Sequence, residues 1–323
     1  MKNSDCWYAI VNPNAGSGKT LAQWRKSEAQ FYEKGIHYSF ARPESASDAH
    51  EKITNACRNG FRKFIAVGGD GTVHNTLNCI VNYVNSQDDL DLGEFYLAVL
   101  PIGSGNDWLR SRNVPNDHRK IIELIASGAF SGQDVVQVDI LDPDDPTGRN
   151  ILNTRYMANI GGYSFDANVC DIVNFQKAHG VTGKMLYVNA LRSIAARQKS
   201  TGARIVCDGE TVFDDLVYSI SFGNGRFSGG GLCQTPSARM DDGIIDLMVA
   251  PKFPLWKLIP SIRKLLTKRI ESIRFLKFYK AREILLEAHG QGQLIEVDGE
   301  IVGRAPARLR VLPSRINAID GRL

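Results

Sequence analysis

The sequence predicts an α/β chain in two domains: a doubly wound parallel sheet, followed by a domain of mostly antiparallel strands. Two observations carry this prediction. Apolar runs alternate with segments of helical spacing as far as residue 128, and from residue 135 short strands follow one another with turn residues between them. The length of 323 residues allows two cores. We expect the boundary near residues 131–134.

The elements of the first domain alternate strictly. Fully apolar runs predict buried strands, and amphipathic spacing predicts helices that cover them. Ser47 is the expected N-cap of the second helix. We expect strands at residues 7–11, 38–41, 64–67 and 95–101, and helices at 21–34, 47–60, 73–84 and 116–128.

The second domain changes pattern because its strands are short and separated by turns rather than by helices. One helical insert, about residues 170–196, interrupts them. A last strand, 307–312, could belong to either domain. The other expected strands are 135–141, 155–161, 203–207, 211–213, 217–223, 244–249, 283–288 and 294–297.

Three strands of the first domain end in polar, glycine-rich loops at residues 12–19, 68–72 and 102–107. In a doubly wound sheet such loops converge on one edge, where ligands bind. Glycines and a helix N-terminus suit a phosphate, and Asp70 stands where a magnesium-bound phosphate needs a carboxylate. Each loop alone could be an ordinary turn. The first loop is not a Walker A motif, because Pro13 occupies the position of its first glycine. Together the loops favour a nucleotide site.

Composition excludes several classes of protein. With 43% hydrophobic and 23% charged residues the chain is typical of a globular protein, and a net charge of +4 is too small to indicate nucleic-acid binding. The six cysteines form no C-x-x-C pair, which favours reduced, structural thiols. The apolar run at residues 7–11 is too short for a signal peptide or a membrane span, so we expect a cytoplasmic protein.

Seven sequence blocks, taken in order, resemble the diacylglycerol kinase catalytic-domain family. This family of soluble bacterial-type lipid kinases is related to sphingosine kinases and NAD kinases. The resemblance implies a nucleotide-binding domain of residues 1–133 and 306–323, a β-sandwich lipid-substrate domain of residues 134–305, and a cleft where ATP meets a lipid hydroxyl. The blocks are residues 12–19, 68–72, 103–107, 158–167, 224–231, 241–243 and 297–300.

The resemblance also implies the residues that bind cofactors. Ser104 keeps the hydroxyl of a threonine common in the family, whereas Arg42 replaces another threonine. A structural Mg²⁺ would be held by the Asp242 carboxylate and the carbonyls of Arg239 and Ile244, although a hairpin turn explains the same Asp-Gly pair. ATP would contact Asn12, Pro13, Asn14, Ala15, Gly16, Arg42, Gly69, Asp70, Gly71, Thr72, Val73, His74, Asn75, Ser104, Asn106 and Asp107.

The expected reaction is ATP- and Mg²⁺-dependent transfer of the γ-phosphate to a lipid hydroxyl. A lipid alcohol is a poor nucleophile and benefits from a carboxylate that takes its proton. Glu300 is the family's candidate for this base, and Asp70 is its rival. Diacylglycerol is the first choice of acceptor. The alternatives are a sphingoid base, ceramide or another lipid, then a soluble alcohol as in NAD kinase, then a non-catalytic nucleotide-binding protein.

A basic, aromatic segment lies between Pro251 and Arg282, with ten Lys and Arg against the single acid Glu271. Such a segment suits an anionic membrane surface, and it equally suits a helix packed on the second domain with a solvated basic face. The partners that we expect are a membrane lipid as substrate, through peripheral contact with the membrane, and no nucleic acid. The sequence leaves open whether the chain forms a homodimer.

Overall fold

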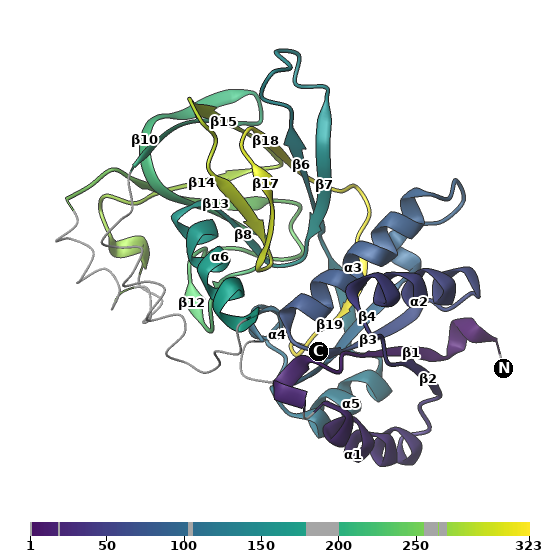
Figure 1. Ribbon diagram of the computed structural model, residues 1–323. Coiled ribbons are helices and arrows are strands. Elements are labelled where there is room, and N and C mark those ends of the chain that lie inside the picture. Colours follow the sequence, from purple (N-terminus) through teal and green to yellow (C-terminus); the bar gives the residue numbers. More distant parts are fainter. Residues whose placement is uncertain (1, 19, 103–105, 179–199, 255–263, 265–269) are drawn as a thin grey trace. The chain divides into compact units, whose positions relative to one another are not determined.

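Figure 1 shows the computed structural model of the chain, which describes residues 2–18, 20–102, 106–178, 200–254, 264 and 270–323. The chain divides into two compact units. The first unit contains residues 1–135 and 312–323, and the second contains residues 136–311. Each unit is described by itself.

The first unit is built on a six-stranded sheet in the order β2-β1-β3-β4-β19-β5. All neighbours are parallel except β5, which runs antiparallel to β19. The strands are β1 (Trp7–Val11), β2 (Tyr38–Ala41), β3 (Lys63–Gly68), β4 (Tyr96–Pro101), β5 (Phe130–Gln133) and β19 (Ile316–Ile319). The four strands predicted for this sheet are confirmed, and their apolar side chains form its core.

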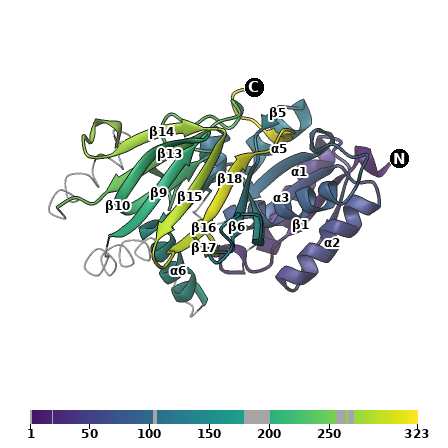
Figure 2. The ribbon, with the colours of Figure 1, turned by 90° about the horizontal axis from the view of Figure 1, so that it is seen from above.

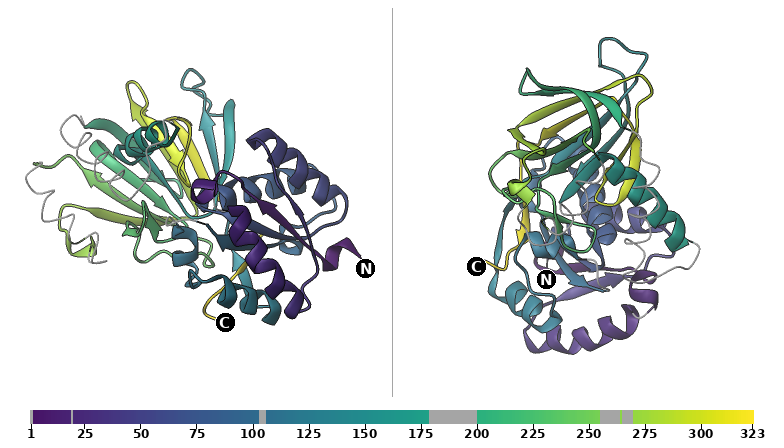
Figure 3. Two further views of the ribbon diagram at one scale, coloured as in Figure 1. Left: turned by 60° about the horizontal axis from the view of Figure 1, so that its bottom comes forward. Right: turned by 90° about the vertical axis from the view of Figure 1, so that its left-hand side faces the viewer.

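Helices cover both faces of this sheet. Figure 1 shows α2 and α3 on one face and α1 and α5 on the other, and Figure 3 gives the same layers from two further sides. They are α1 (Thr20–Glu33), α2 (Ala46–Arg58), α3 (Asp70–Asn85), α4 (Asp107–Ser111) and α5 (His118–Ser127), with short 3-10 turns at Asn3–Asp5, Ala15–Gly18 and Leu92–Glu94.

The four predicted helix starts are shifted by one to three residues, and the shifts of α2 and α3 are informative. The N-cap of α2 is Ser45 and not Ser47, because the Ser45 hydroxyl accepts the N–H of Asp48 at 3.1 Å. Helix α3 begins at Asp70, three residues earlier than expected, directly after the N-cap Gly69. The strand β3 therefore passes into α3 with almost no intervening loop, which brings the helix N-terminus to the end of the strand.

The second unit is an antiparallel sheet in the order β17-β16-β8-β10-β9-β15-β18-β6-β7, extended by β13 on β10 and by β14 on β13. Figure 2 shows its strands from above. The elements are β6 (Val136–Leu141), β7 (Ile151–Met157), β8 (Ile160–Ser164), α6 (Phe165–Ala178), β9 (Thr201–Cys207), β10 (Glu210–Gly223), β11 (Phe227–Ser228), β12 (Leu232–Cys233), β13 (Ile245–Pro251), a 3-10 turn (Ile270–Ser272), β14 (Lys277–Ala281), β15 (Glu283–His289), β16 (Leu294–Val297), β17 (Glu300–Arg304) and β18 (Ala307–Val311).

Several expected strands are divided or joined differently in this sheet. The segment 155–161 is split by a turn at Ala158-Asn159, whereas 211–213 and 217–223 belong to one long strand, β10. The described part of the helical insert is α6, which ends at Ala178. The rest of the insert, expected to continue to residue 196, lies outside the described residues.

The last predicted strand belongs to the second unit. Strand β18 pairs with β15 and β6, and the chain returns to the first unit only with β19. The division therefore falls at residues 135/136 and 311/312, and not at 133/134 and 305/306. The physical reason is that Ala307 and Leu309 are fully buried in the core of the second unit.

No helix among the described residues is long and apolar enough to cross a membrane. All six cysteines are free thiols. Burial raises the pKa of the Cys57 and Cys79 thiols to about 12, so these two residues act as small apolar side chains at neutral pH.

Candidate active site

In the first unit, the first two predicted loops meet at the point where the strand order reverses. The chain passes from β1 to β2 on one side and continues with β3 on the other, so β1 and β3 are parallel neighbours. The Asn12 N–H donates to the Val67 carbonyl at 3.0 Å, and Asn12 Nδ2 donates to Thr72 Oγ1 at 3.0 Å. This reversal is the usual ligand position in such sheets.

Gly68 allows the tight passage from β3 into α3. A Cβ on Gly68 would lie 2.1 Å from Thr72 Oγ1, a distance that no side-chain atom tolerates. The Gly68 carbonyl accepts the N–H of Ile102 at 2.9 Å, which brings the start of the third loop to the same place. All three predicted loops therefore gather at one edge of the sheet.

Asp70 joins the third loop to the N-terminus of α3. Its Oδ2 accepts the N–H of Asp107 at 3.0 Å and its Oδ1 accepts the N–H of Trp108 at 3.1 Å, at the first turn of α4. The negative carboxylate also lies at the positive end of that helical turn. Asp70 thus anchors α4 in this structure.

The other residues predicted to bind ATP differ in exposure. Asn14, Arg42 and Asn75 are exposed, and Arg42 directly follows β2 at the same sheet edge. Val73 and His74 are buried at 2% and 3% exposure, so their side chains face the interior of the unit. Ser104 lies outside the described residues. Pro13, Ala15, Gly16, Gly69 and Gly71 are half-buried, and Asn106 and Asp107 are buried.

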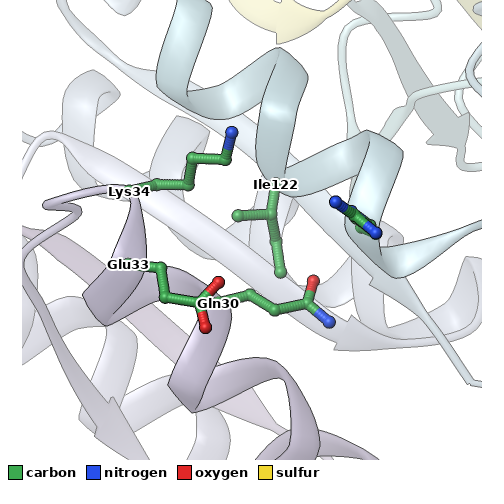
Figure 4. Close-up of a pocket in the computed structure, with 5 residues that line it drawn as sticks. Gln30, Glu33, Lys34 and Ile122 are labelled. Carbon is green, nitrogen blue, oxygen red and sulfur yellow. The ribbon is translucent and has the colours of Figure 1, made fainter.

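A surface pocket of about 240 Å³ lies between α1 and α5 of the first unit (Figure 4). Its lining mixes acidic, basic and apolar side chains, and none of the predicted site residues belongs to it. The lining residues are Gln30, Glu33, Lys34, Arg119 and Ile122.

In the second unit, three of the sequence blocks converge around Asp298. This residue and Gly299 form the two-residue turn of the β16–β17 hairpin, with φ of 51° and 93°. The Asp298 carboxylate accepts the N–H groups of Ala158, Asn159 and Ile160 at 2.7, 2.8 and 3.1 Å. The hairpin is thereby fixed to the turn between β7 and β8.

The third block reaches the same turn from β10. The N–H groups of Asn224 and Gly225 donate to the Asn159 carbonyl at 2.9 and 2.7 Å, and Asn224 Nδ2 donates to the Ala158 carbonyl at 2.9 Å. Asn224 is fully buried. These contacts form a rigid support under the hairpin.

Glu300 follows this turn as the first residue of β17, and its side chain is exposed. Two residues before the turn, Glu296 is buried at 7% exposure and accepts the Gly299 N–H at 2.9 Å. Burial raises the pKa of Glu296 well above its usual range, although the Gly299 N–H opposes the shift; the nearby carboxylates of Asp166, Asp298 and Glu300 raise it further.

Glu296 and Asp166 are features that the sequence prediction missed. Burial also raises the pKa of Asp166, whose Oδ2 accepts the Ser221 hydroxyl at 2.6 Å. A weak signal was the acidic Glu296 inside the predicted strand 294–297, whose other three residues are apolar. The packing of Glu296 against β8 and α6 was not visible in that pattern.

The predicted magnesium loop lies just before β13. Asp242 is exposed, and its Oδ1 accepts the Ile244 N–H at 3.2 Å across Gly243, whose φ is 73°. One carboxylate and two carbonyls, those of Arg239 and Ile244, are hard oxygen ligands that fit Mg²⁺. The described residues contain no cluster of three or more His, Cys, Asp or Glu side chains placed to hold a metal.

The basic segment is described only in part, because residues 255–263 and 265–269 lie outside the described residues. Its last third is not helical: it contains β14 (Lys277–Ala281), on the edge of the sheet. There Lys280 pairs with the buried Asp246 at 3.2 Å, and Lys277 lies over the Phe213 ring at 5.2 Å.

Comparison with known proteins covers nearly the whole chain. A model described as the diacylglycerol kinase catalytic domain matches residues 6–138, and one described as the YegS C-terminal NAD kinase beta sandwich-like domain matches residues 161–320. A diacylglycerol kinase of Mycobacterium tuberculosis is 25% identical over 97% of this chain and 94% of its own length. A diacylglycerol kinase of Staphylococcus carnosus is also 25% identical, over 95% of this chain and 92% of its own.

Solved structures agree in fold. A diacylglycerol kinase of Bacillus anthracis superposes with a TM-score of 0.75 at 20% identity, covering 98% of this chain and 97% of that one. Yeast NADH kinase superposes with a TM-score of 0.55 at 12% identity, covering 98% and 83%. The expected α/β unit followed by an antiparallel β-sandwich is confirmed. With its two halves matched in order by these models, the chain belongs to the diacylglycerol kinase catalytic-domain family and is a lipid kinase of that family.

Proposed function

We propose that the chain transfers the γ-phosphate of ATP to the hydroxyl of diacylglycerol, with Glu300 as the general base. The observation that carries this proposal is the exposed Glu300 carboxylate, which follows directly on a turn fixed by three N–H bonds to Asp298. A base held on a rigid support and open to substrate meets the positional requirement of proton transfer.

The sheet edge of the first unit supports ATP as the donor. Its features are those of phosphate sites: the N-terminal turn of α3, where the half-buried Gly69 and Gly71 carry no side chain, and Asn12 bonded to Thr72 across two loops. Phosphoryl transfer needs positioning and charge compensation more than covalent chemistry. Asn12, Asn14, Arg42 and Asn75 are the candidate side chains for holding the nucleotide.

The contacts of Asp70 favour Glu300 as the base. Both Asp70 oxygens accept backbone N–H groups of α4, and such bonds stabilise the charged carboxylate and weaken it as a proton acceptor. Within the part of the chain that the structure describes, the Glu300 carboxylate accepts no backbone N–H group in this way. We therefore assign Asp70 to positioning of the nucleotide loops.

The proposal includes a Mg²⁺ ion bound in the second unit. Asp242 would hold it together with the carbonyls of Arg239 and Ile244; when bound, the ion would supply positive charge and order this loop. The basic residues of 251–282 would bring the enzyme to an anionic membrane surface, where its lipid substrate lies.

The test is transfer of labelled γ-phosphate from ATP into the organic phase, using mixed micelles of diacylglycerol, monoacylglycerol, sphingosine, ceramide or phosphatidylglycerol with Mg²⁺. We expect labelling of diacylglycerol, and loss of about 10²–10⁴-fold in rate for Glu300→Gln. Glu210→Gln, an exposed carboxylate at the start of β10, serves as the control. Labelling of another lipid alone would correct the acceptor.

Two outcomes would contradict the proposal. Wild-type rates in Glu300→Gln would remove the base assignment. Binding of ATP without labelling of any lipid would lead next to NAD as a soluble acceptor, and then to a non-catalytic nucleotide-binding role.

A further inference from the structure

Helix α6 lies beside the β16–β17 hairpin that carries Glu300 (Figure 1). Cys170 and Asn174 are four residues apart on this helix, so they share one face. Both side chains point to the tip of the hairpin, although they are more than 120 residues away in the chain.

The carbonyl of Gly299 accepts hydrogen bonds from both residues. Cys170 Sγ donates to it at 2.9 Å, and Asn174 Nδ2 donates to it at 2.8 Å. Asn174 Nδ2 also lies 3.4 Å from Cys170 Sγ, which fixes the two donors relative to each other. On the opposite side, the Gly299 N–H donates to Glu296 Oε2 at 2.9 Å.

Both polar groups of Gly299 are therefore held by side chains from outside the turn. A two-residue hairpin of this type needs no such help, because its geometry follows from the positive φ of Asp298 and Gly299. The Gly299 carbonyl belongs to the peptide that continues into Glu300. Its orientation consequently sets the direction in which the Glu300 side chain leaves the backbone.

We propose that Cys170 and Asn174 are positioning residues for the catalytic base. By holding the Gly299 carbonyl from α6, they fix the peptide before Glu300 so that its carboxylate meets the lipid hydroxyl. The inference rests on the proposed role of Glu300. A displacement of about 1 Å at a reacting group can cost about 100-fold in rate, so two bonds on this peptide matter for catalysis.

The test compares variants that remove the donors with variants that keep them. Asn174→Leu and Cys170→Ala remove one donor each, whereas Cys170→Ser keeps an O–H donor at the same position. Asp171→Asn, an exposed residue on the same helix, is the control. We expect kcat in the micelle assay to fall about 10- to 100-fold in Asn174→Leu/Cys170→Ala. KM for ATP should stay unchanged, because the nucleotide loops belong to the other unit, and Cys170→Ser should keep most of the activity.

A double-mutant comparison separates positioning from general loss of structure. In a Glu300→Gln background the base is absent, so removal of the two donors should cause little further loss of the residual rate. A donor pair that only stabilises the fold would lower the rate equally in both backgrounds, and that result would overturn the inference.

Hydrogen exchange gives a readout that needs no lipid. Loss of the donors should speed amide exchange in a peptide spanning residues 298–302 while peptides of the first unit exchange as before. Unchanged exchange at 298–302 would overturn the inference whatever the activity. Wild-type activity in Glu300→Gln would overturn the base assignment, and with it this inference, whereas loss in Glu300→Gln but not in the α6 variants would overturn this inference alone.

Discussion

Gly68→Ala is the substitution that tests the geometry of the strand-to-helix passage most directly. The φ of Gly68 lies outside the left-handed region, so alanine has no backbone strain there, and the entire cost should come from contact with Thr72. The new Cβ would lie 2.1 Å from Thr72 Oγ1 and 2.8 Å from Thr72 Cβ. Contacts under 3.0 Å are essentially never seen, so something must move.

Thr72 has little room to move. It is 6% exposed, its N–H donates to the Gly69 carbonyl at 2.9 Å, and its Oγ1 accepts Asn12 Nδ2. Overpacking costs about 1–3 kcal/mol, and loss of the Asn12 bond adds about 1 kcal/mol. The smaller unfolded-state entropy of alanine returns about 0.4–1 kcal/mol. The first unit should therefore lose about 1–3.5 kcal/mol of unfolding free energy.

Urea denaturation followed by tryptophan fluorescence measures this loss, because Trp7, Trp24 and Trp108 all lie in the first unit. Gly132→Ala in β5 is the control: its Cβ would meet only the flexible Arg315 side chain, at 3.2 Å. In a Thr72→Ala background the cost of Gly68→Ala should shrink, since the clashing hydroxyl is gone. Equal costs in both backgrounds, or a Gly68→Ala protein as stable as wild type, would refute the reasoning.

Three further substitutions test the buried polar groups. Glu296→Gln keeps an acceptor for the Gly299 N–H, and its stabilising effect on the second unit should grow as pH rises above the unfolded-state pKa of about 4.3. The raised pKa means that the wild-type fold loses stability once pH exceeds the unfolded value of about 4.3; a pH-independent difference in urea midpoint would contradict this. Arg112→Met should destabilise the first unit in urea denaturation, mainly because the Ile319 and Ala318 carbonyls lose their Arg112 donors, at about 1–3 kcal/mol for each one left unsatisfied. Asp320 keeps Arg322 at 2.7 Å as its charged partner. A loss under about 1 kcal/mol would argue against a role of Arg112 in stability. Asp298→Asn should lower the thermal midpoint of the second unit, because one amide oxygen cannot accept three N–H bonds worth about 1.5–3 kcal/mol each; an unchanged midpoint would show that the turn holds without them.

The sequence by itself determined the parallel sheet and its three ligand loops. The segments 64–67 and 95–101 are apolar along their whole length, a pattern typical of strands that are buried on both faces. Gly68 follows the first segment directly, and Gly103 follows the second after one residue. Convergence of the loops followed from parallel topology alone. Two short strands were missed for the opposite reason: neither is an apolar run, since β5 reads Phe-Ser-Gly-Gln and β19 reads Ile-Asn-Ala-Ile.

Only the tertiary structure decided what the acidic residues do. Asp70 and Asp298 read alike in sequence as carboxylates beside glycines, but each accepts backbone N–H groups from a segment distant in the chain, and so each anchors a turn. Glu296 and Glu300 differ by burial, which depends on how β8 and α6 pack against the hairpin. Local pattern fixes where a strand ends and a turn begins, whereas hydrogen-bond partners and solvent exposure depend on contacts between segments far apart in sequence, and these contacts separate the anchors from the candidate base.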